Sequence, residues 1–425
     1  MEYEISKPVA STKAGKLRLW IVVIAFFSYM VAFFDRANVT VLIADTNFTD
    51  VFGITADKST QGLLLTAFLL FYGVTCFFAG PMVHRMGPRK ALGYGLVSWA
   101  VFMAVMGSIS SVAILLTCRA LLGIGEAVLG PSVSKLVQTW FPVQERAKVN
   151  GTWFIGLLSA QIVATPMITG LVTSLGWRGS FYMLAFIGLF PAIASFLLVY
   201  DAPHKHPRVS REEIGHISGG LGETIGDASK SRSLGGFGFL KESNFWLIAA
   251  IYAITNAIGW GLMGWLPTYF KANLGFSFAK MGLVAALPYL MGAASVILFT
   301  PLMDRLNARA PFAVVGCLGF GICLFAAMNV SDPTWAVVIF CLATAFFTPA
   351  TPALFTMLQN TIKSTEIANA TGFFNGISYI FASAFPFLMG ALYSSTGNLK
   401  NGFYLLVLIT ILAILMGIPL MKRHL

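Results

Sequence analysis

The sequence predicts an all-α membrane protein with twelve transmembrane helices arranged in two six-helix bundles. The first observation is composition, because 57% of the 425 residues are hydrophobic and only 11% are charged. A soluble domain carries roughly 25% charged residues. The second is a set of twelve apolar runs, each near the ~20 residues that a helix needs to cross a bilayer. The third is the distribution of Lys and Arg, most of which lie in the loops and tails on one side of the predicted membrane. This composition excludes an ordinary cytosolic enzyme, a disordered chain and a secreted disulfide scaffold.

The chain begins with about 16 polar residues and then enters its first apolar run without an Ala-x-Ala cleavage signal. We therefore interpret this run as a retained span and not as a signal peptide. The first six predicted spans are 17–43, 59–81, 91–108, 112–135, 149–171 and 181–200. The second six are 245–270, 281–300, 311–328, 335–359, 370–393 and 402–421.

One long polar segment separates the two sets of spans. Residues 201–244 are rich in Gly, Ser and charged side chains, a composition typical of a linker. The predicted organisation is an N-terminal bundle (1–200), a cytoplasmic linker (201–244) and a C-terminal bundle (245–425).

The positions of the basic residues predict the orientation. Both termini, the even-numbered loops and the linker hold 21 of the 28 Lys and Arg, the opposite side holds five, and two lie inside spans. Cytoplasmic loops carry the excess of basic residues, so we expect both termini in the cytoplasm. The net charge of +11 therefore reflects membrane topology and gives no support to nucleic-acid binding. The short tails favour the inner membrane of a bacterium.

An internal repeat supports the two-bundle organisation. Residues 81–85 read Pro-Met-Val-His-Arg, and residues 301–305 read Pro-Leu-Met-Asp-Arg, 220 positions later. The offset is close to half the chain, and each segment follows the second span of its half. Such duplication is typical of one large class of secondary transporters.

Four charged residues lie well inside predicted spans: Asp35, Arg36, Arg119 and Glu126. Each costs at least about 2.5–3.5 kcal/mol at membrane depth, so such residues are kept mainly where they pair or function. With a rise of ~1.5 Å per residue, Asp35 and Arg119 share a level in the outer half, and Glu126 lies near the midplane. Arg119 and Glu126 are two turns apart on one helix face. Together they predict a polar track from the outer mouth toward the centre.

Each of these residues has two interpretations. Asp35 is either a proton acceptor coupled to Arg119 or a partner that neutralises that arginine. Glu126 has no obvious cation except Arg119, and a low dielectric disfavours a charged carboxylate; we favour a proton-coupling role for both acids. Arg36 points to a different face from Asp35 and can bind a carboxylate through two parallel hydrogen bonds. It is either the anchor of an anionic substrate or an arginine that reaches the outer headgroups.

The loop after the second span resembles a motif of the major facilitator superfamily, Gly-x-x-x-Asp-Arg-x-Gly-Arg-Arg. The matching residues are Gly80, Arg85, Gly87, Arg89 and Lys90. The resemblance implies that the acidic residue of this motif holds a charge–helix contact at the cytoplasmic gate. His84 stands at that position and cannot supply a negative charge, whereas Asp304, followed by Arg305, supplies it in the second half.

Within that superfamily the chain resembles the anion:cation symporter family, which includes galactonate, glucarate, hexuronate, tartrate and phthalate carriers. The resemblance covers essentially the whole chain. It rests on Asp35-Arg36-x-Asn38, on the segment 119–127 (Arg-Ala-Leu-Leu-Gly-Ile-Gly-Glu-Ala) and on Trp265-Leu266-Pro267. The resemblance implies that Asp35 and Glu126 couple protons and that Tyr72 and Asn375 contact the substrate beside Arg36 and Arg119. It also implies a monomer with the major facilitator fold.

These observations predict a secondary active transporter that imports a small organic anion together with protons by alternating access. No ATP-binding motif, metal-ligand spacing or nucleophile–base constellation is present in the sequence, so we expect no enzyme activity, cofactor or metal. Two alternatives stay open. One is an anion exchanger or facilitator without proton coupling, and the other is a non-transporting sensor, for which the tails and the linker leave little room. Sugar acids, dicarboxylates and aromatic carboxylates all fit an arginine-anchored pocket.

Overall fold

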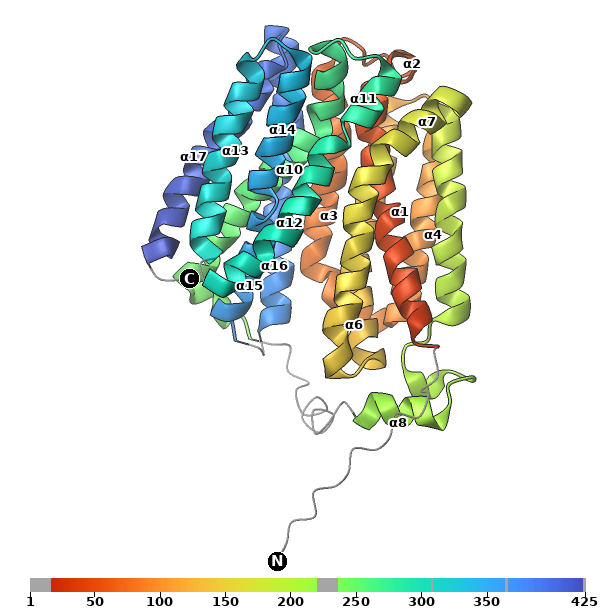
Figure 1. Cartoon of the computed structure of the whole chain (residues 1–425). Coiled ribbons are helices and arrows are strands. Elements are labelled where there is room, and N and C mark those ends of the chain that lie inside the picture. The colour runs from red at the N-terminus through yellow and green to blue at the C-terminus, as the bar shows by residue number, and fades with distance from the viewer. Residues whose placement is uncertain (1–16, 220–235, 307–308, 364–365, 423–425) are drawn as a thin grey trace, which may run out of the picture.

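The computed structural model describes residues 17–219, 236–306, 309–363 and 366–422 (Figure 1). Every regular element in these ranges is a helix. The first half contains α1 (Leu19–Ile43), α2 (Thr46–Val51), α3 (Lys58–Met86), α4 (Pro88–Ser108), α5 (Val112–Ala127), α6 (Leu129–Trp140) and α7 (Val143–Leu198). The second half contains α10 (Ser243–Ala272), α11 (Phe278–Val284), α12 (Leu287–Leu306), α13 (Arg309–Asn329), α14 (Pro333–Phe347), α15 (Ala350–Thr361), α16 (Ile367–Thr396) and α17 (Lys400–Lys422). The described parts of the linker form η1 (Pro203–Lys205), α8 (Arg211–Gly219) and η2 (Gly238–Lys241).

The described residues include eleven helical stretches that are long and apolar enough to cross a membrane. One of them, α7, has 56 residues and would measure about 84 Å if it were straight. It reverses direction at Gly176, whose φ of 71° and ψ of 171° are not helical, and Figure 1 shows its two limbs running in opposite directions. Helix α7 therefore contains the predicted spans 149–171 and 181–200. The prediction of an all-helical membrane fold is confirmed.

Two predicted spans are each divided into two helices, and in each a proline lies at the start of the second helix. The fourth span divides between α5 and α6, where Pro131 lies at the third position of α6. The tenth divides between α14 and α15, where Pro352 lies at the third position of α15. Proline has no N–H for the helical bond to the fourth residue before it, so each helix is interrupted just upstream. The two prolines occupy equivalent places in the two halves, which extends the internal repeat.

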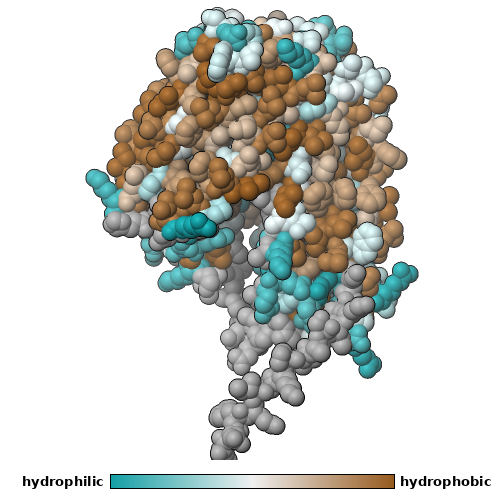
Figure 2. Space-filling model, viewed as in Figure 1, coloured by the Kyte–Doolittle hydropathy of each residue, from teal (hydrophilic) through white to brown (hydrophobic). Residues whose placement is uncertain are grey.

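The helices of each half pack mainly on one another. Helix α1 and α4 pack against α7, and α3 packs against α5, whereas α13 packs against α14 and α17 in the second half. Helices α3 and α16 form a long seam between the halves. Large apolar side chains cover the outside, including Phe186, Ile297 and Leu298, each about 70% exposed, and Figure 2 shows this apolar belt. Water-soluble monomers rarely expose such a continuous surface, so the belt fits contact with lipid.

The two halves are in contact at the end opposite the linker. At the closed end, Lys271 donates a hydrogen bond of 2.7 Å to the carbonyl oxygen of Ala44, and the backbone of α16 at Pro386 lies against Gly62 of α3. Farther toward the linker, α7 and α12 are separated by an apolar cleft of about 590 Å³, lined by Ile162, Val163, Pro166, Met167, Ala286, Leu287 and Leu290. The divisions at residues 200 and 245 and the cytoplasmic position of the termini stay predictions.

Candidate functional site

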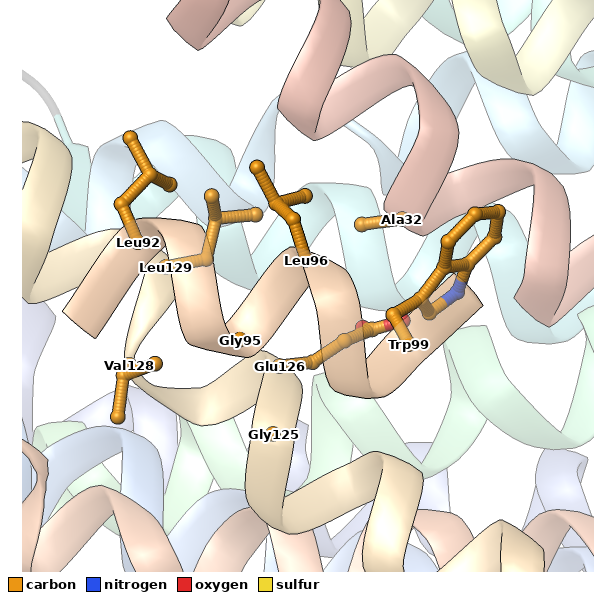
Figure 3. Close-up of a pocket in the computed structure, with 9 residues that line it drawn as sticks. All are labelled: Ala32, Leu92, Gly95, Leu96, Trp99, Gly125, Glu126, Val128 and Leu129. Carbon is orange, nitrogen blue, oxygen red and sulfur yellow. The ribbon is translucent and has the colours of Figure 1, made fainter. Parts of the chain in front are cut away.

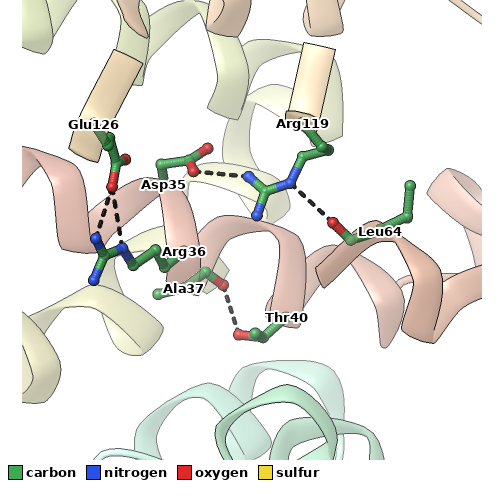
Figure 4. Close-up of polar contacts among 7 residues, drawn as sticks. All are labelled: Asp35, Arg36, Ala37, Thr40, Leu64, Arg119 and Glu126. Carbon is green, nitrogen blue, oxygen red and sulfur yellow. Dashed lines mark hydrogen bonds and ion pairs between the residues drawn. The ribbon is translucent and has the colours of Figure 1, made fainter. Parts of the chain in front are cut away.

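The four charged residues predicted inside spans form two ion pairs between α1 and α5 (Figure 4). In the first pair, Nη1 of Arg119 lies 2.7 Å from Oδ2 of Asp35, and both side chains are completely buried. Nε of Arg119 also donates to the carbonyl oxygen of Leu64 on α3, at 3.2 Å. The predicted neighbourhood of Asp35 and Arg119 is therefore present in the structure, and Arg119 joins three helices.

The second pair joins Arg36 and Glu126. Nη2 and Nε of Arg36 donate to Oε2 of Glu126 at 2.8 and 3.2 Å. The expectation that Arg119 is the one cation near Glu126 is thus wrong. Arg119 and Glu126 do lie on one face of α5, but two helical turns separate them by ~10 Å along the axis, so each side chain pairs with a different residue of α1. The long side chain of Arg36 reaches Glu126 and does not extend to the headgroups.

Aromatic rings from both halves surround the guanidinium of Arg36. Its Cζ lies 5.2 Å from the ring centre of Phe68, 5.3 Å from that of Tyr72 and 5.4 Å from that of Trp260. The ring of Tyr72 lies 4.6 Å from that of Tyr379 on α16. Cation–π attraction holds an arginine over such faces. The structure therefore places the predicted residue Tyr72 beside Arg36, at the interface of the two halves.

The other predicted substrate contact, Asn375, belongs to a polar group in the second half. The hydroxyl of Tyr252 donates to Oδ1 of Asn375 at 3.2 Å, and Nδ2 of Asn256 donates to Oγ of Ser378 at 2.6 Å. Three residues of this group were not predicted from the sequence: Tyr252, Asn256 and Ser378. Their signal is the helical spacing of polar residues within apolar runs, four apart in α10 and three apart in α16, which puts each pair on one face.

At the junction of α3 and α4, the backbone binds a carboxylate that belongs to a distant segment of the chain. His84 and Arg85 are exposed, but the backbone N–H of Arg89 donates to Oδ1 of Asp201 at 2.9 Å. Gly87, with a φ of 82°, brings the start of α4 against that carboxylate. The Arg89 side chain donates to the carbonyl oxygen of Phe196. Asp201 thus supplies the negative charge at this helix N-terminus that His84 cannot supply.

Two further residues of the predicted gate lie at the surface. Gly80 is exposed on α3 and Arg305 is exposed on α12. The side chain of Asp304 lies outside the described part of the structure, so its predicted contact stays a prediction.

The chain is similar to known proteins over most of its length. The family model described as Major Facilitator Superfamily matches residues 25–386 and 272–424. A probable L-galactonate transporter of Escherichia coli is 25% identical over 401 residues, which cover 92% of this chain and 86% of that protein. A probable sulfoacetate transporter of Cupriavidus necator is 27% identical, and the match covers 90% of this chain and 89% of that protein.

The fold is also similar to the crystal structure of a bacterial homolog of the human lysosomal transporter Spinster in an inward-facing, unoccupied conformation. The TM-score is 0.78 at 16% identity, and the match covers 97% of this chain and 98% of the other. The family match extends over most of the chain, and the helical architecture agrees with it. The chain therefore belongs to the Major Facilitator Superfamily, and it is a transporter and not an enzyme.

Proposed function

We propose that this transporter imports a small organic anion, a sugar acid or a related carboxylate, by proton symport. The observation that carries the proposal is the buried ion pair of Arg36 and Glu126 at the interface of the two halves. Two relatives named for transport of galactonate and sulfoacetate support an anionic substrate.

The pair offers a direct coupling of proton and anion. While Glu126 is charged, it occupies two N–H donors of Arg36. A proton that enters from the outer side neutralises Glu126 and weakens this contact, so a substrate carboxylate takes its place on the guanidinium. Arginine binds carboxylates through parallel hydrogen bonds. One proton and one anion together leave the net charge of the site unchanged, which avoids the cost of moving a lone charge in low dielectric.

The other predicted residues have supporting roles in this mechanism. Asp35 is the second proton acceptor, with Arg119 as the cation that responds to its protonation. Tyr72 contributes a hydroxyl from the first half, and Asn375 contributes an amide from the second half. The loaded complex then allows the halves to rock about the site. The protein works as a monomer in a bacterial inner membrane with both termini in the cytoplasm.

Uptake by proteoliposomes tests this proposal. A panel of labelled galactonate, glucarate, glucuronate, tartrate, phthalate and sulfoacetate is offered with and without an inwardly directed proton gradient. We expect the gradient to stimulate uptake of one compound and Arg36→Ala to abolish it. Glu126→Gln is expected to lose the stimulation but to keep substrate exchange. Uptake that ignores the gradient would remove symport and leave exchange or facilitation, and transport by Arg36→Ala at the wild-type rate would remove the anchor.

A further inference from the structure

A small cavity lies beside Glu126 (Figure 3). Its volume is about 10 Å³, which is room for one water molecule. Residues of α1, α4, α5 and α6 and the turn between α5 and α6 line it: Ala32, Leu92, Gly95, Leu96, Trp99, Gly125, Glu126, Val128 and Leu129. All but two of these residues are aliphatic or glycine. The two exceptions, Glu126 and Trp99, each have a polar atom that can face the cavity.

These two polar atoms are a complementary acceptor and donor. Within the described residues, Oε1 of Glu126 and Nε1 of Trp99 are buried and have no hydrogen-bond partner. The whole residues are 5% and 2% exposed. A buried polar group without a partner is costly, and a water molecule can satisfy both because it accepts one hydrogen bond and donates another.

The packing of Trp99 directs its N–H edge away from α7. Gly188 on α7 has the six-membered ring of the Trp99 indole at the place where a Cβ would stand, with Cζ3 and Cε3 as the nearest atoms. These atoms lie on the edge of the indole opposite Nε1. The glycine therefore fixes the ring with its donor edge toward the α1–α4–α5 interior, which contains the cavity.

We propose that this cavity is a water site in which one water molecule accepts a hydrogen bond from Nε1 of Trp99 and donates one to Oε1 of Glu126. Trp99 is then a positioning residue that acts on Glu126 through the water. The inference rests on the proposed role of Glu126 in proton coupling. It places a hydrogen-bond donor for Glu126 at Oε1, the carboxylate oxygen that Arg36 does not bind.

The water has a defined effect on the charge of Glu126. The indole N–H only donates, so it orients the hydrogens of the water toward the carboxylate and stabilises the charged form. The other charged and titratable groups that act on Glu126 come from α1, α5 and α16: Arg36, Asp35, Arg119 and Tyr379. None of them lines the cavity. Loss of the water therefore leaves Glu126 holding its proton to a higher pH, by about 0.5–1 pH unit for one hydrogen bond.

The test is the pH midpoint of gradient-driven uptake in proteoliposomes. Trp99→Phe removes the N–H and keeps an aromatic ring, and Ala32→Val fills the cavity with methyl groups from α1. Both are expected to raise the midpoint by about 0.5–1 pH unit. Trp140→Phe is the matched control, because the Trp140 N–H bonds to the carbonyl oxygen of Tyr200 outside the cavity, and it is expected to leave the midpoint in place. In a Glu126→Gln background, Trp99→Phe should have no further effect.

The possible outcomes separate this inference from the proposed function. If wild-type uptake does not depend on pH, proton coupling itself fails. If wild-type uptake depends on pH and both cavity variants titrate like the wild type, the water site is overturned. A high-resolution map of the wild-type protein gives a second measurement that needs no variant. Density for one water within hydrogen-bond distance of both atoms supports the site, and a direct Trp99–Glu126 bond with no water between overturns it.

Discussion

The buried charges of α1 and α5 are arranged so that each has one partner of opposite sign. Asp35 pairs with Arg119, and Arg36 pairs with Glu126. A charge inside a bilayer stays only where a partner or a function compensates its cost. The guanidinium of Arg119 also binds the Leu64 carbonyl and so joins three helices, whereas the Arg36 pair lies among aromatic rings at the interface.

Removal of one member of the completely buried Asp35–Arg119 pair should destabilise the protein strongly. Asp35→Leu leaves the completely buried Arg119 without its carboxylate, and such a loss costs about 3–5 kcal/mol. The double variant Asp35→Leu with Arg119→Leu should recover most of this stability, because no unpaired charge is left. Thermal unfolding in detergent measures both effects. A double variant as unstable as the single would show that the pair contributes more than neutralisation.

Gly188 of α7 is the residue against which the Trp99 ring packs. Alanine normally stabilises a helix relative to glycine by up to about 1 kcal/mol, but a Cβ at position 188 would overlap the Trp99 ring. Gly188→Ala should therefore lower the unfolding temperature, since steric overlap in a packed core costs about 1–3 kcal/mol. Gly170→Ala in the same helix is the control, because a Cβ there meets no atom within 4 Å. Equal unfolding temperatures for the two variants would contradict this packing.

At the scale of single elements, the start of α3 shows how a short polar signal defines a helix end. Asp57 precedes the helix and accepts hydrogen bonds from the hydroxyl of Thr60 at 2.6 Å and from its backbone N–H at 3.0 Å. These two bonds lower the pKa of the Asp57 carboxyl below its ordinary value. Such an N-cap contributes about 0.5–2 kcal/mol.

This cap predicts a pH dependence of stability. Because the folded-state pKa of Asp57 is lowered, its contribution is fully present above the ordinary carboxyl range and is lost as the pH falls through the lowered value. The difference in unfolding temperature between wild type and Asp57→Ala should thus be constant near neutral pH and shrink in acid. Asp57→Asn keeps an acceptor for the helix and should stay close to wild type at neutral pH. A difference that persists unchanged into acid would rule out the charged cap.

The start of α4 makes a second prediction at this scale. Asp201→Ala removes the carboxylate that accepts the Arg89 N–H, and the loss of such an N-terminal acceptor costs about 1 kcal/mol. His84→Ala should leave stability unchanged, because the His84 side chain is exposed. The measurement is the unfolding temperature of both variants. If His84→Ala is the more damaging of the two, Asp201 does not take over the role of the missing acid.

At the scale of the whole molecule, the contact between the halves at the end opposite the linker requires a small residue in α3. The carbonyl of Pro386 on α16 lies where a Cβ of Gly62 would stand. This neighbour is backbone, so it has no rotamer by which it can move aside. The closed end therefore depends on a glycine at the point where the two halves touch.

Gly62→Ala should separate the halves at that end and favour the opposite conformation of the transport cycle. Spin labels at the exposed positions Asp50 and Asn398, in a variant without native cysteines, report the distance between the two halves there. We expect a longer distance in Gly62→Ala than in the parent. Gly80→Ala in the same helix is the control, because a Cβ there meets no atom within 4 Å. An unchanged distance in Gly62→Ala would contradict the role of this contact.

Much of the architecture was predictable because it depends on properties that each segment carries by itself. An apolar run of ~20 residues crosses a bilayer wherever it stands in a fold, so the spans follow from the sequence. The reversals and interruptions of the helices were not predicted from the sequence. The reversal at Gly176 joins two predicted spans into one continuous element, and the interruptions near Pro131 and Pro352 depend on local backbone bonds.

The candidate site was predictable in its members and not in its pairings. The cost of burying charge identified Asp35, Arg36, Arg119 and Glu126, because that cost depends only on residue type and depth. The choice of Arg36 as the partner of Glu126 depends on how α1 and α5 cross and on the reach of a long side chain.

By itself, the sequence determined that this is a polytopic helical membrane protein of duplicated organisation with a charged centre in its first half. Only the tertiary structure decided that Asp201 supplies the carboxylate at the start of α4, that aromatic rings from both halves surround Arg36, and that a cavity lies between Glu126 and Trp99. The physical reason is that some effects act within one segment of the chain and others act between distant segments. Hydropathy and burial cost act on one segment at a time, whereas hydrogen bonds, ion pairs and cavities need atoms from distant segments within a few ångströms of each other.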